Sequence, residues 1–202
     1  MLLARYDSEY KHQVGCDEAG RGCLAGPVVA AAVLLPSGFN HAQLNDSKKL
    51  SVSMRNQLRT MILEQALSYG IGVVSHEEID EINILQASFL AMHRAIDQIN
   101  TKIDLLLIDG NRFKPYKEIP HHCIIKGDGK YQSIAAAAIL AKTYRDELMK
   151  NLHMSYPHYY LDKNKGYASA SHIAAIEERG YSPIHRKTFK LKKLSNQLYL
   201  SF

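Results

Sequence analysis

One short stretch, residues 14–27, limits the folds open to this chain more than any other feature. An apolar lead-in ends in two adjacent carboxylates, Asp17 and Glu18, and a Gly-Arg-Gly turn follows at residues 20–22. A second apolar run comes next, at residues 28–35. Neighbouring side chains of a strand point to opposite faces, so the two acids can share a ligand only where the strand ends or bends, and glycines allow such a bend. Two acids beside a cationic glycine turn indicate a divalent metal next to a phosphate.

The apolar runs predict a mixed sheet. The first two runs are closely joined, which favours an antiparallel pair, whereas later runs at 103–108 and 122–125 are separated by helical segments, which favours parallel strands. Strands and helices mixed in this way predict an α/β domain with a sheet between helices. At 202 residues the chain suits one domain, 1–202, with its own core. Residues from about 150 to 202 are expected to form a helical and basic C-terminal extension of it.

Apolar spacing predicts the helices. One begins at Met54 and is expected to stop at Gly70. Ser75 and Glu78 form a capping-box pattern that opens a long amphipathic helix. Another helix begins by about Ser133 with an alanine-rich face, and a last one covers roughly 171–179. The expected buried stripe of the long helix is Ile82, Leu85, Phe89, Met92, Ile96 and Ile99.

Composition excludes several classes of protein. The chain is 46% hydrophobic and 22% charged, as in ordinary globular proteins. Its longest apolar run, residues 24–35, is shorter than the ~20 residues that span a bilayer. The N-terminus lacks the apolar stretch of a signal peptide, and three cysteines without a Cys-x-x-Cys pattern favour a reducing compartment. We therefore expect a cytoplasmic protein with no membrane partner.

Positive charge is concentrated at the C-terminus. The net charge is +5, and residues 180–202 contain no Asp or Glu but five Lys and Arg. A basic tail on a near-neutral body favours a nucleic-acid partner. The alternative is a solvated tail that only aids solubility.

Three acidic sites share one context, because Asp17-Glu18, Asp109 and Asp128 each follow an apolar run and lie beside glycine. Residues at strand ends gather around one crevice in α/β sheets. Carboxylates about 5 Å apart repel by roughly 3 kcal/mol per ionised pair at an effective dielectric of ~20, so protons or cations must neutralise them. Oxygen ligands without a Cys/His set favour Mg²⁺ or Mn²⁺ over zinc. For any single Asp before Gly, the alternative is a strand-end turn or helix cap.

The phrase Asp-Glu-Ala-Gly-Arg-Gly at residues 17–22, followed by Gly26-Pro27, resembles the opening signature of ribonuclease HII, the type 2 ribonuclease H. The motifs Ile108-Asp109-Gly110 and Lys126-Gly127-Asp128, and the run 133–146, resemble later motifs of that family. The resemblance covers most of the chain. It implies a ribonuclease H-like mixed β-sheet flanked by helices.

The resemblance also implies an activity. It makes Asp17, Glu18, Asp109 and Asp128 the catalytic, metal-binding quartet for two Mg²⁺ or Mn²⁺ ions. The implied enzyme is a metal-dependent endoribonuclease that cuts the RNA strand of RNA/DNA hybrids and incises at ribonucleotides embedded in duplex DNA. Two-metal phosphodiester hydrolysis would leave 3′-hydroxyl and 5′-phosphate ends, with roles in replication and repair through removal of ribonucleotides and RNA primers.

Substrate selection is assigned by the resemblance to the turn Gly20-Arg21-Gly22 and to Tyr167. The turn would sense the ribonucleotide hydroxyl and the adjacent phosphate, and Tyr167 would stack on the sugar at the RNA–DNA junction. The alternatives are a tight turn with a solvated arginine and an ordinary core or rim tyrosine. Lys48 and Lys49, within the family's Asp-Ser-Lys-Lys-Leu phrase, could meet phosphates or simply lead into a helix in solvent.

The C-terminal signature has weaker candidates and some departures. His172, His185 and Arg186 belong to it, but histidines on helices are more often structural than catalytic. The family commonly has Gly where Ala168 stands and Ser where Ala138 stands. Neither change removes a charged ligand, so they bear on substrate positioning rather than on the reaction.

The last six residues contain a glutamine and spaced apolar anchors, Gln197, Leu200 and Phe202. They resemble peptides by which bacterial proteins dock on the replication sliding clamp, and such anchors suit a preformed pocket. The competing interpretation is a segment that folds back on its own core.

Two rival functions remain open from the sequence. One is another nuclease of the same superfamily, such as a DNA exonuclease or a junction resolvase, which substrates with and without one 2′-hydroxyl would separate. The other is a non-catalytic nucleic-acid-binding module. The intact acidic quartet argues against the second rival.

Overall fold

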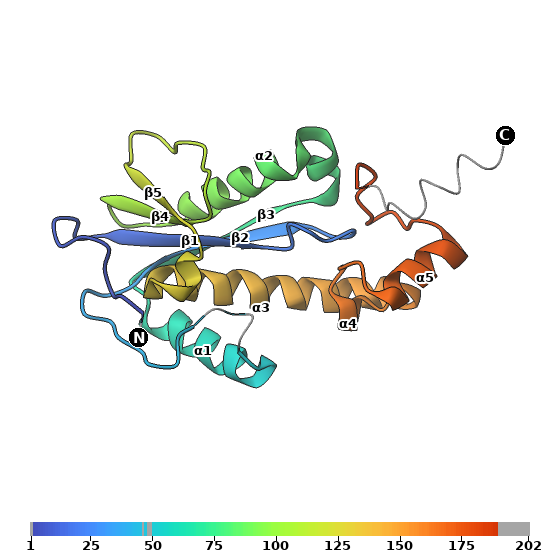
Figure 1. The fold of residues 1–202 in the computed structure, drawn as a ribbon, viewed down its shortest axis with the longest axis horizontal. Coiled ribbons are helices and arrows are strands. Elements are labelled where there is room, and N and C mark those ends of the chain that lie inside the picture. Colours follow the sequence, from blue (N-terminus) through green and yellow to red (C-terminus); the bar gives the residue numbers. More distant parts are fainter. Residues whose placement is uncertain (1, 46, 48–49, 190–202) are drawn as a thin grey trace.

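A five-stranded mixed sheet forms the centre of the computed structural model, which describes residues 2–45, 47 and 50–189. The strand order is β3-β2-β1-β4-β5 (Figure 1). β1, β2 and β3 pair antiparallel, whereas β4 runs parallel to β1 and β5 parallel to β4, which confirms the predicted mixed sheet. The strands are β1 (Gln13–Ala19), β2 (Val28–Leu34), β3 (Ser68–Val74), β4 (Leu105–Asp109) and β5 (His121–Ile124).

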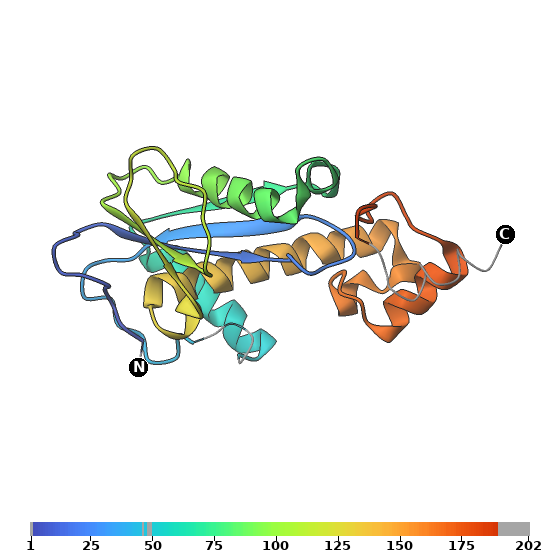
Figure 2. The ribbon, with the colours of Figure 1, turned by 45° about the horizontal axis from the view of Figure 1, so that its top comes forward.

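Helices cover both faces of this sheet. α2 lies on one face, and α3 with α1 lies on the other (Figure 1). α4 and α5 lie beyond the ends of β1 and β2, beside the C-terminal end of α3 (Figure 2). No helix in the described ranges is long and apolar enough to cross a bilayer. The helices are α1 (Val52–Gln65), α2 (His76–Ile96), α3 (Gln132–Ser155), α4 (Leu161–Asn164) and α5 (Ala170–Arg179), with 3₁₀ turns at Gly127–Gly129 and Pro157–Tyr159.

Small residues let α3 lie close to the sheet. Every residue of β2 is buried, as expected for a strand covered on both faces. The alanines at 135–138 of α3 are also buried. At Gly15 a Cβ atom would lie 2.2 Å from the carbonyl carbon of Ser133, so the start of α3 packs directly on the backbone of β1. This close approach brings one face of α3 over the end of β1.

On the other face, two glycines of β3 allow close packing of α2. A Cβ atom at Gly70 would lie 2.1 Å from the Ala95 carbonyl oxygen, and one at Gly72 would lie 1.9 Å from that of Ala91. The expectation that Gly70 stops a helix was therefore wrong. α1 ends at Gln65, and Gly70 is needed inside a strand because a helix crosses it at backbone distance.

The predicted capping box at the start of α2 is confirmed, because the Ser75 side chain accepts from the Glu78 N–H and the Glu78 side chain accepts from the Ser75 N–H. The predicted buried stripe is only partly right. Asn83 has φ 65° and ψ 161°, which breaks the helical repeat, and its side chain accepts hydrogen bonds from the next turn at Leu85 and Gln86. The stripe therefore shifts, and the buried residues of α2 are Ile79, Ala87, Ser88, Ala91, Met92, Ala95 and Ile96.

Candidate active site

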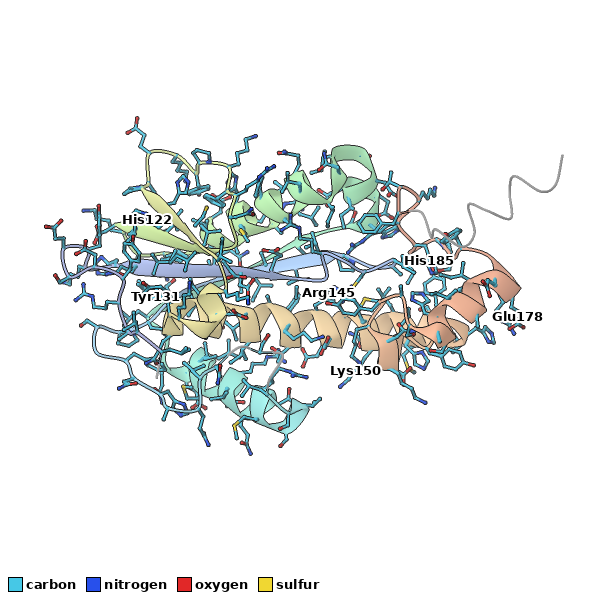
Figure 3. The ribbon with its side chains drawn as sticks, in the orientation of Figure 1. His122, Tyr131, Arg145, Lys150, Glu178 and His185 are labelled. Carbon is cyan, nitrogen blue, oxygen red and sulfur yellow. The ribbon has the colours of Figure 1, made fainter. Side chains whose placement is uncertain are left out.

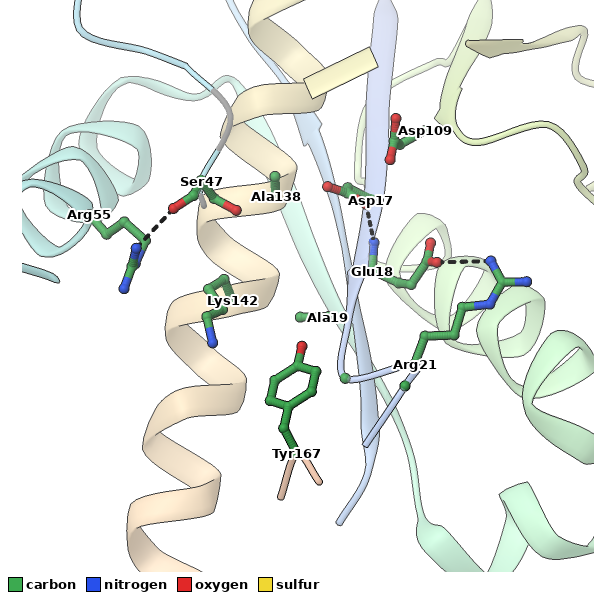
Figure 4. A pocket seen from close by; sticks show the side chains of 12 residues that line it. Asp17, Glu18, Ala19, Arg21, Ser47, Arg55, Asp109, Ala138, Lys142 and Tyr167 are labelled. Atoms are coloured by element: carbon green, nitrogen blue, oxygen red, sulfur yellow. Dashed lines mark hydrogen bonds and ion pairs between the residues drawn. The ribbon is translucent and has the colours of Figure 1, made fainter. Parts of the chain in front are cut away.

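The register of two parallel strands brings the first two acids together. β1 and β4 pair with Cys16 opposite Ile108, so Asp17 and Asp109 follow side by side at the ends of that pairing. Cys16 packs in the core beneath α2, and Asp17, one residue on, faces the opposite side. Figure 4 shows Asp17 and Asp109 at the same pocket, with Glu18 next to them where β1 approaches its end. The prediction that these acids meet at strand ends is confirmed for this pair.

Asp128 reaches the same region through a tight turn after β5. Lys126 adopts a left-handed conformation with φ 56°, and a single 3₁₀ turn follows at Gly127–Gly129. The Gly127 N–H donates to Asp109 Oδ1 at 2.7 Å, which fixes this turn against the end of β4. Asp128 is buried, and its charge contributes to the raised pKa of Asp17. All four predicted acids therefore act within one electrostatic neighbourhood.

A cavity of about 580 Å³ opens in front of these carboxylates (Figure 4). Ala138 and Lys142 reach it from α3, Arg55 from α1, and Tyr167 from the segment between α4 and α5. Asp128 is not part of the wall. The full lining is Asp17, Glu18, Ala19, Gly20, Arg21, Gly22, Ser47, Arg55, Asp109, Ala138, Lys142 and Tyr167.

Burial and charge repulsion both act on the acidic wall. Burial raises the pKa of Asp17 well above its usual range, and the charges of Glu18, Asp109 and Asp128 raise it further. One hydrogen bond opposes this, because the Glu18 N–H donates to Asp17 Oδ1 at 2.7 Å. Arg21 Nη1 lies 3.2 Å from Glu18 Oε1, but half of the Arg21 side chain is exposed. Added positive charge would therefore favour the ionised form of Asp17.

These residues suit a hard divalent cation. Their donors are carboxylate oxygens, which Mg²⁺ and Mn²⁺ prefer. Across residues 2–45, 47 and 50–189, no three His, Cys, Asp or Glu side chains form a ready-made metal cluster. The charge repulsion around Asp17 is the observation that fits a cation here, because a bound cation would neutralise it.

The turn at residues 20–22 is held by a buried arginine. Arg186 Nη2 donates to the Gly20 carbonyl at 2.7 Å, Nη1 to the Arg21 carbonyl at 2.9 Å, and Nε to the Gly26 carbonyl at 3.0 Å. Arg186 is fully buried, and burial lowers its pKa to about 10. The turn lines the pocket together with the acids, and its role in binding substrate stays a prediction.

Arg145 packs against the same turn from the side of α3. Its Nε donates to the Pro27 carbonyl at 2.9 Å and its Nη1 to the Lys165 carbonyl at 2.8 Å. Gly20 has φ 93°, and a Cβ atom there would lie 1.9 Å from Arg145 Nε. The position of Arg145 therefore requires glycine at residue 20.

Tyr167 faces the acids from the other wall (Figure 4). Its side chain is 43% exposed, and the Lys142 ammonium and Arg145 guanidinium each lie 5.9 Å from its ring centre. The ring is thus available to a ligand that enters the pocket, with cations on its flank. The alternative of a tyrosine enclosed in the core is wrong.

Some predicted residues lie outside the described ranges, and some residues near the cavity were not predicted. Lys48 and Lys49, like Gln197, Leu200 and Phe202, lie outside the described residues. The sequence reasoning missed Arg55, Lys142 and Arg145 as parts of the site. Ala138, Lys142 and Arg145 recur at helical spacing on α3, and this spacing was the available signal.

Comparisons with known proteins show the family of this chain. The family described as Ribonuclease HII matches residues 14–192. A ribonuclease HII of Bacteroides thetaiotaomicron is 60% identical over 201 residues, covering 100% of both chains, and one of Porphyromonas gingivalis is 59% identical over 190 residues, covering 94% of each.

Solved structures show the same fold. Ribonuclease H2 from Pyrococcus horikoshii superposes with a TM-score of 0.76 at 24% identity, covering 95% of this chain and 100% of the other. The PCNA:RNase HII complex from Archaeoglobus fulgidus gives 0.71 at 25% identity, covering 90% and 96%. Matching in sequence over nearly its whole length, this chain belongs to the ribonuclease HII family.

Proposed function

We propose that this ribonuclease HII cuts the RNA strand of RNA/DNA hybrids and incises at ribonucleotides embedded in duplex DNA, leaving 3′-hydroxyl and 5′-phosphate ends. One observation carries the proposal. One cavity is lined by the carboxylates of Asp17, Glu18 and Asp109, by the Gly20–Gly22 turn that follows the same strand, and by Tyr167, which faces the acids (Figure 4). Phosphate chemistry and sugar recognition can therefore occur on one bound nucleotide.

The acidic wall would hold the metal ions. Asp17, Glu18, Asp109 and Asp128 are the residues we assign to two Mg²⁺ or Mn²⁺ ions, and the repulsion around Asp17 supports this assignment. Such ions supply an activated water and charge stabilisation of the leaving oxygen. A Bst-RNase HIII of the same fold was solved in complex with Mn²⁺. The chain's own contribution is to keep the carboxylates together at the ends of β1 and β4.

Tyr167, which faces the acids, and the Gly20–Gly22 turn form the wall that would read the sugar. A protein separates RNA from DNA by contacting the 2′-hydroxyl. Gly20 and Gly22 lack side chains, so the main chain of the turn can approach a ribose closely. Tyr167 presents a half-exposed ring on which a sugar can pack. Arg55 and Lys142, also on the wall, are cations suited to the flanking phosphates.

The deciding experiment uses two duplexes that differ in one 2′-hydroxyl. We expect incision at the single ribonucleotide with Mg²⁺ or Mn²⁺, and no incision of the all-deoxy duplex. Cleavage of both duplexes alike would favour the rival DNA nuclease. Binding of both without metal-dependent turnover would favour the non-catalytic module.

Tyr167→Ala tests the sugar-reading wall. We expect cleavage at a single embedded ribonucleotide to fall by about tenfold to a hundredfold, since positioning errors have effects of this size. Tyr160→Ala is the matched control, because Tyr160 is equally exposed but does not line the cavity. Wild-type rates in Tyr167→Ala would contradict the role.

A partner at the C-terminus is proposed on the resemblance of residues 197–202 to clamp-docking peptides. An RNase HII of related fold has been solved together with PCNA, which supports a partner of this kind. Deletion of residues 197–202 should abolish binding to the replication sliding clamp and leave cleavage of short duplexes unchanged. Clamp binding undetectable in both the full and the shortened chain would remove the proposal.

A further inference from the structure

Two buried histidines form a chain of hydrogen bonds that ends on the main chain of Tyr167. His172 of α5 and His185 of the following segment are 0% and 1% exposed. Their Nε2 atoms lie 3.0 Å apart. His172 Nδ1 lies 2.9 Å from the Tyr167 carbonyl oxygen, and His185 Nδ1 lies 2.9 Å from the Ser182 nitrogen. Figure 3 shows His185 in the segment beside α5.

The partners at the two ends assign the protons. His185 Nδ1 lies 2.9 Å from the Ser182 nitrogen, 2.8 Å from the Ser182 hydroxyl and 3.3 Å from the Ser182 carbonyl. The N–H can only donate and the carbonyl is the most distant of the three, so we assign His185 Nδ1 as the acceptor and place the His185 proton on Nε2. That proton is donated to His172 Nε2, which leaves the His172 proton on Nδ1, where it is donated to the Tyr167 carbonyl. The hydrogen bonds therefore run in one direction, from Ser182 through His185 and His172 to Tyr167, and both histidine rings are neutral.

The surroundings keep the pair neutral. Burial lowers the pKa of His172, and burial together with His172 lowers that of His185 to about 4. A second proton on His172 would lie on Nε2, against the His185 Nε2–H at 3.0 Å, and a second proton on His185 would lie on Nδ1, against the Ser182 N–H at 2.9 Å. At neutral pH the hydrogen-bond chain thus has a single arrangement.

Arg186, the residue after His185, binds the Gly20–Gly22 turn, which is the other part of the proposed sugar-reading wall. Arg186 donates to the carbonyls of Gly20 and Arg21, and its own N–H donates to the Leu24 carbonyl at 2.8 Å. Leu24 in turn donates to the Gly166 carbonyl, next to Tyr167. Two adjacent residues therefore connect the turn near the N-terminus with the tyrosine more than 140 positions later.

We propose that His172 and His185 are positioning residues that orient Tyr167 relative to the Gly20–Gly22 turn, and that the dipeptide His185-Arg186 sets the geometry with which this site recognises a ribose. The inference rests on the proposed ribonucleotide-cleaving function. Neither histidine lines the cavity, so both act through the main chain of Tyr167 rather than by touching substrate.

The test replaces each ring without removing its bulk. His172→Phe and His185→Phe keep the aromatic packing but break the hydrogen-bond chain. On a duplex with one ribonucleotide, we expect kcat/KM to fall about tenfold to a hundredfold in both variants. Tyr159→Phe is the control, because its ring packs against both histidines while its hydroxyl bonds only the Gly180 carbonyl among the described residues. It should lose less than about threefold.

A double-mutant cycle separates positioning from simple destabilisation. In a Tyr167→Ala background, His172→Phe should add nothing further to the loss of kcat/KM, because its effect passes through Tyr167. Multiplied losses in the double variant would overturn the proposal, as would wild-type kcat/KM in both histidine variants. Either result would leave ribonucleotide cleavage by the wild-type enzyme intact.

Nitrogen-15 NMR of the wild-type histidines gives a measurement that needs neither cleavage nor a folded variant. We expect His185 as the Nε2–H tautomer and His172 as the Nδ1–H tautomer at pH 7. Other tautomers, or rapid exchange between them, would overturn the hydrogen-bond chain. If the wild-type enzyme fails to cleave at a ribonucleotide while these tautomers are found, the proposed function fails and the positioning of Tyr167 stands.

Discussion

The two walls of the cavity bury polar groups in opposite ways. On the acidic wall, Asp17 and Asp109 stand together at the ends of two strands, and their charges work against each other. Behind the facing wall, which is formed by Tyr167 and the Gly20–Gly22 turn, Arg145 and Arg186 are more deeply buried than the acids, and each of their side-chain nitrogens donates to a main-chain carbonyl. The carboxylates of one wall repel one another, whereas the buried arginines behind the other wall have hydrogen-bond partners for their side-chain nitrogens.

This difference indicates how the work is divided. Buried groups with complete hydrogen bonds hold one geometry, so the wall of the Gly20–Gly22 turn is preformed. Clustered carboxylates whose charges raise the pKa of Asp17 are stabilised when cations bind. We infer that the acidic wall supplies charge for the chemistry and the facing wall supplies shape for recognition. Four predictions test this contrast.

The largest effect is expected at the acidic wall. Asp109→Asn keeps the side-chain volume but removes one charge. We expect the cleavage rate to fall by about a thousandfold or more. A bound cation stabilises the transition state by several kcal/mol, and each ~1.36 kcal/mol changes the rate about tenfold. The unfolding temperature in metal-free buffer should stay equal or rise, since one of the charges that raise the pKa of Asp17 is removed.

Glu118→Gln is the control for this experiment, because it neutralises an exposed carboxylate away from the cavity. Retained turnover in Asp109→Asn would refute the assignment of the acids. A large loss of stability in metal-free buffer would show that the acidic wall is internally balanced after all.

On the facing wall the main effect should be on stability. Arg186→Met leaves the buried carbonyls of Gly20, Arg21 and Gly26 without their donors, and each such loss costs about 1–3 kcal/mol. We expect the free energy of unfolding in urea to fall by about 4 kcal/mol. Lys187→Met removes the same charge from an exposed neighbour and should change it by less than about 0.5 kcal/mol. Equal effects of the two variants would contradict the contrast between the walls.

Acid should weaken the facing wall through His185. Its pKa is about 4 when folded and 6.5 when free, so the unfolded chain binds more protons between these values. Stability is therefore fully present above pH 6.5 and is lost as the pH falls toward 4, by up to about 3 kcal/mol. His172 lies directly against the His185 ring, and the charge of His76 also disfavours the protonation of His185. The measurement is urea unfolding at several pH values in wild type and His185→Phe, whose profile should be flatter over this range.

The smallest effect separates two glycines of the same turn. Gly20→Ala combines a positive φ with a collision against Arg145, so it should lower the free energy of unfolding by about 1–3 kcal/mol. Gly22→Ala places its Cβ in open space and should change stability by less than about 1 kcal/mol. Thermal unfolding of both variants provides the measurement, and equal stabilities would mean that the turn is not locked by Arg145.

Local patterns in the sequence predicted much of the fold and part of the site. Apolar runs at four of the five strands indicated a mixed sheet. Acids beside glycines marked the neighbouring ends of β1 and β4 and the turn after β5. The capping box at Ser75 was also predictable, because its two hydrogen bonds join residues three positions apart. Such signals depend only on neighbours along the chain.

Other features depend on distant contacts. Gly70 was predicted to stop a helix because no residue near it in the sequence shows that α2 crosses it in the fold. Asn83 breaks α2 and shifts its buried face, which periodicity alone could not show. Arg186 joins Gly20 across 166 positions, and Arg145 joins Ala25 across 120.

By itself, the sequence determined which residues carry charge, where strands end, and which turn lacks side chains, because these are local properties of the chain. Only the tertiary structure decided that Arg145, Arg186, His172 and His185 would be buried together behind one wall of the cavity. The physical reason is that a buried polar group is tolerated only when its partners surround it, and here those partners come from both ends of the chain.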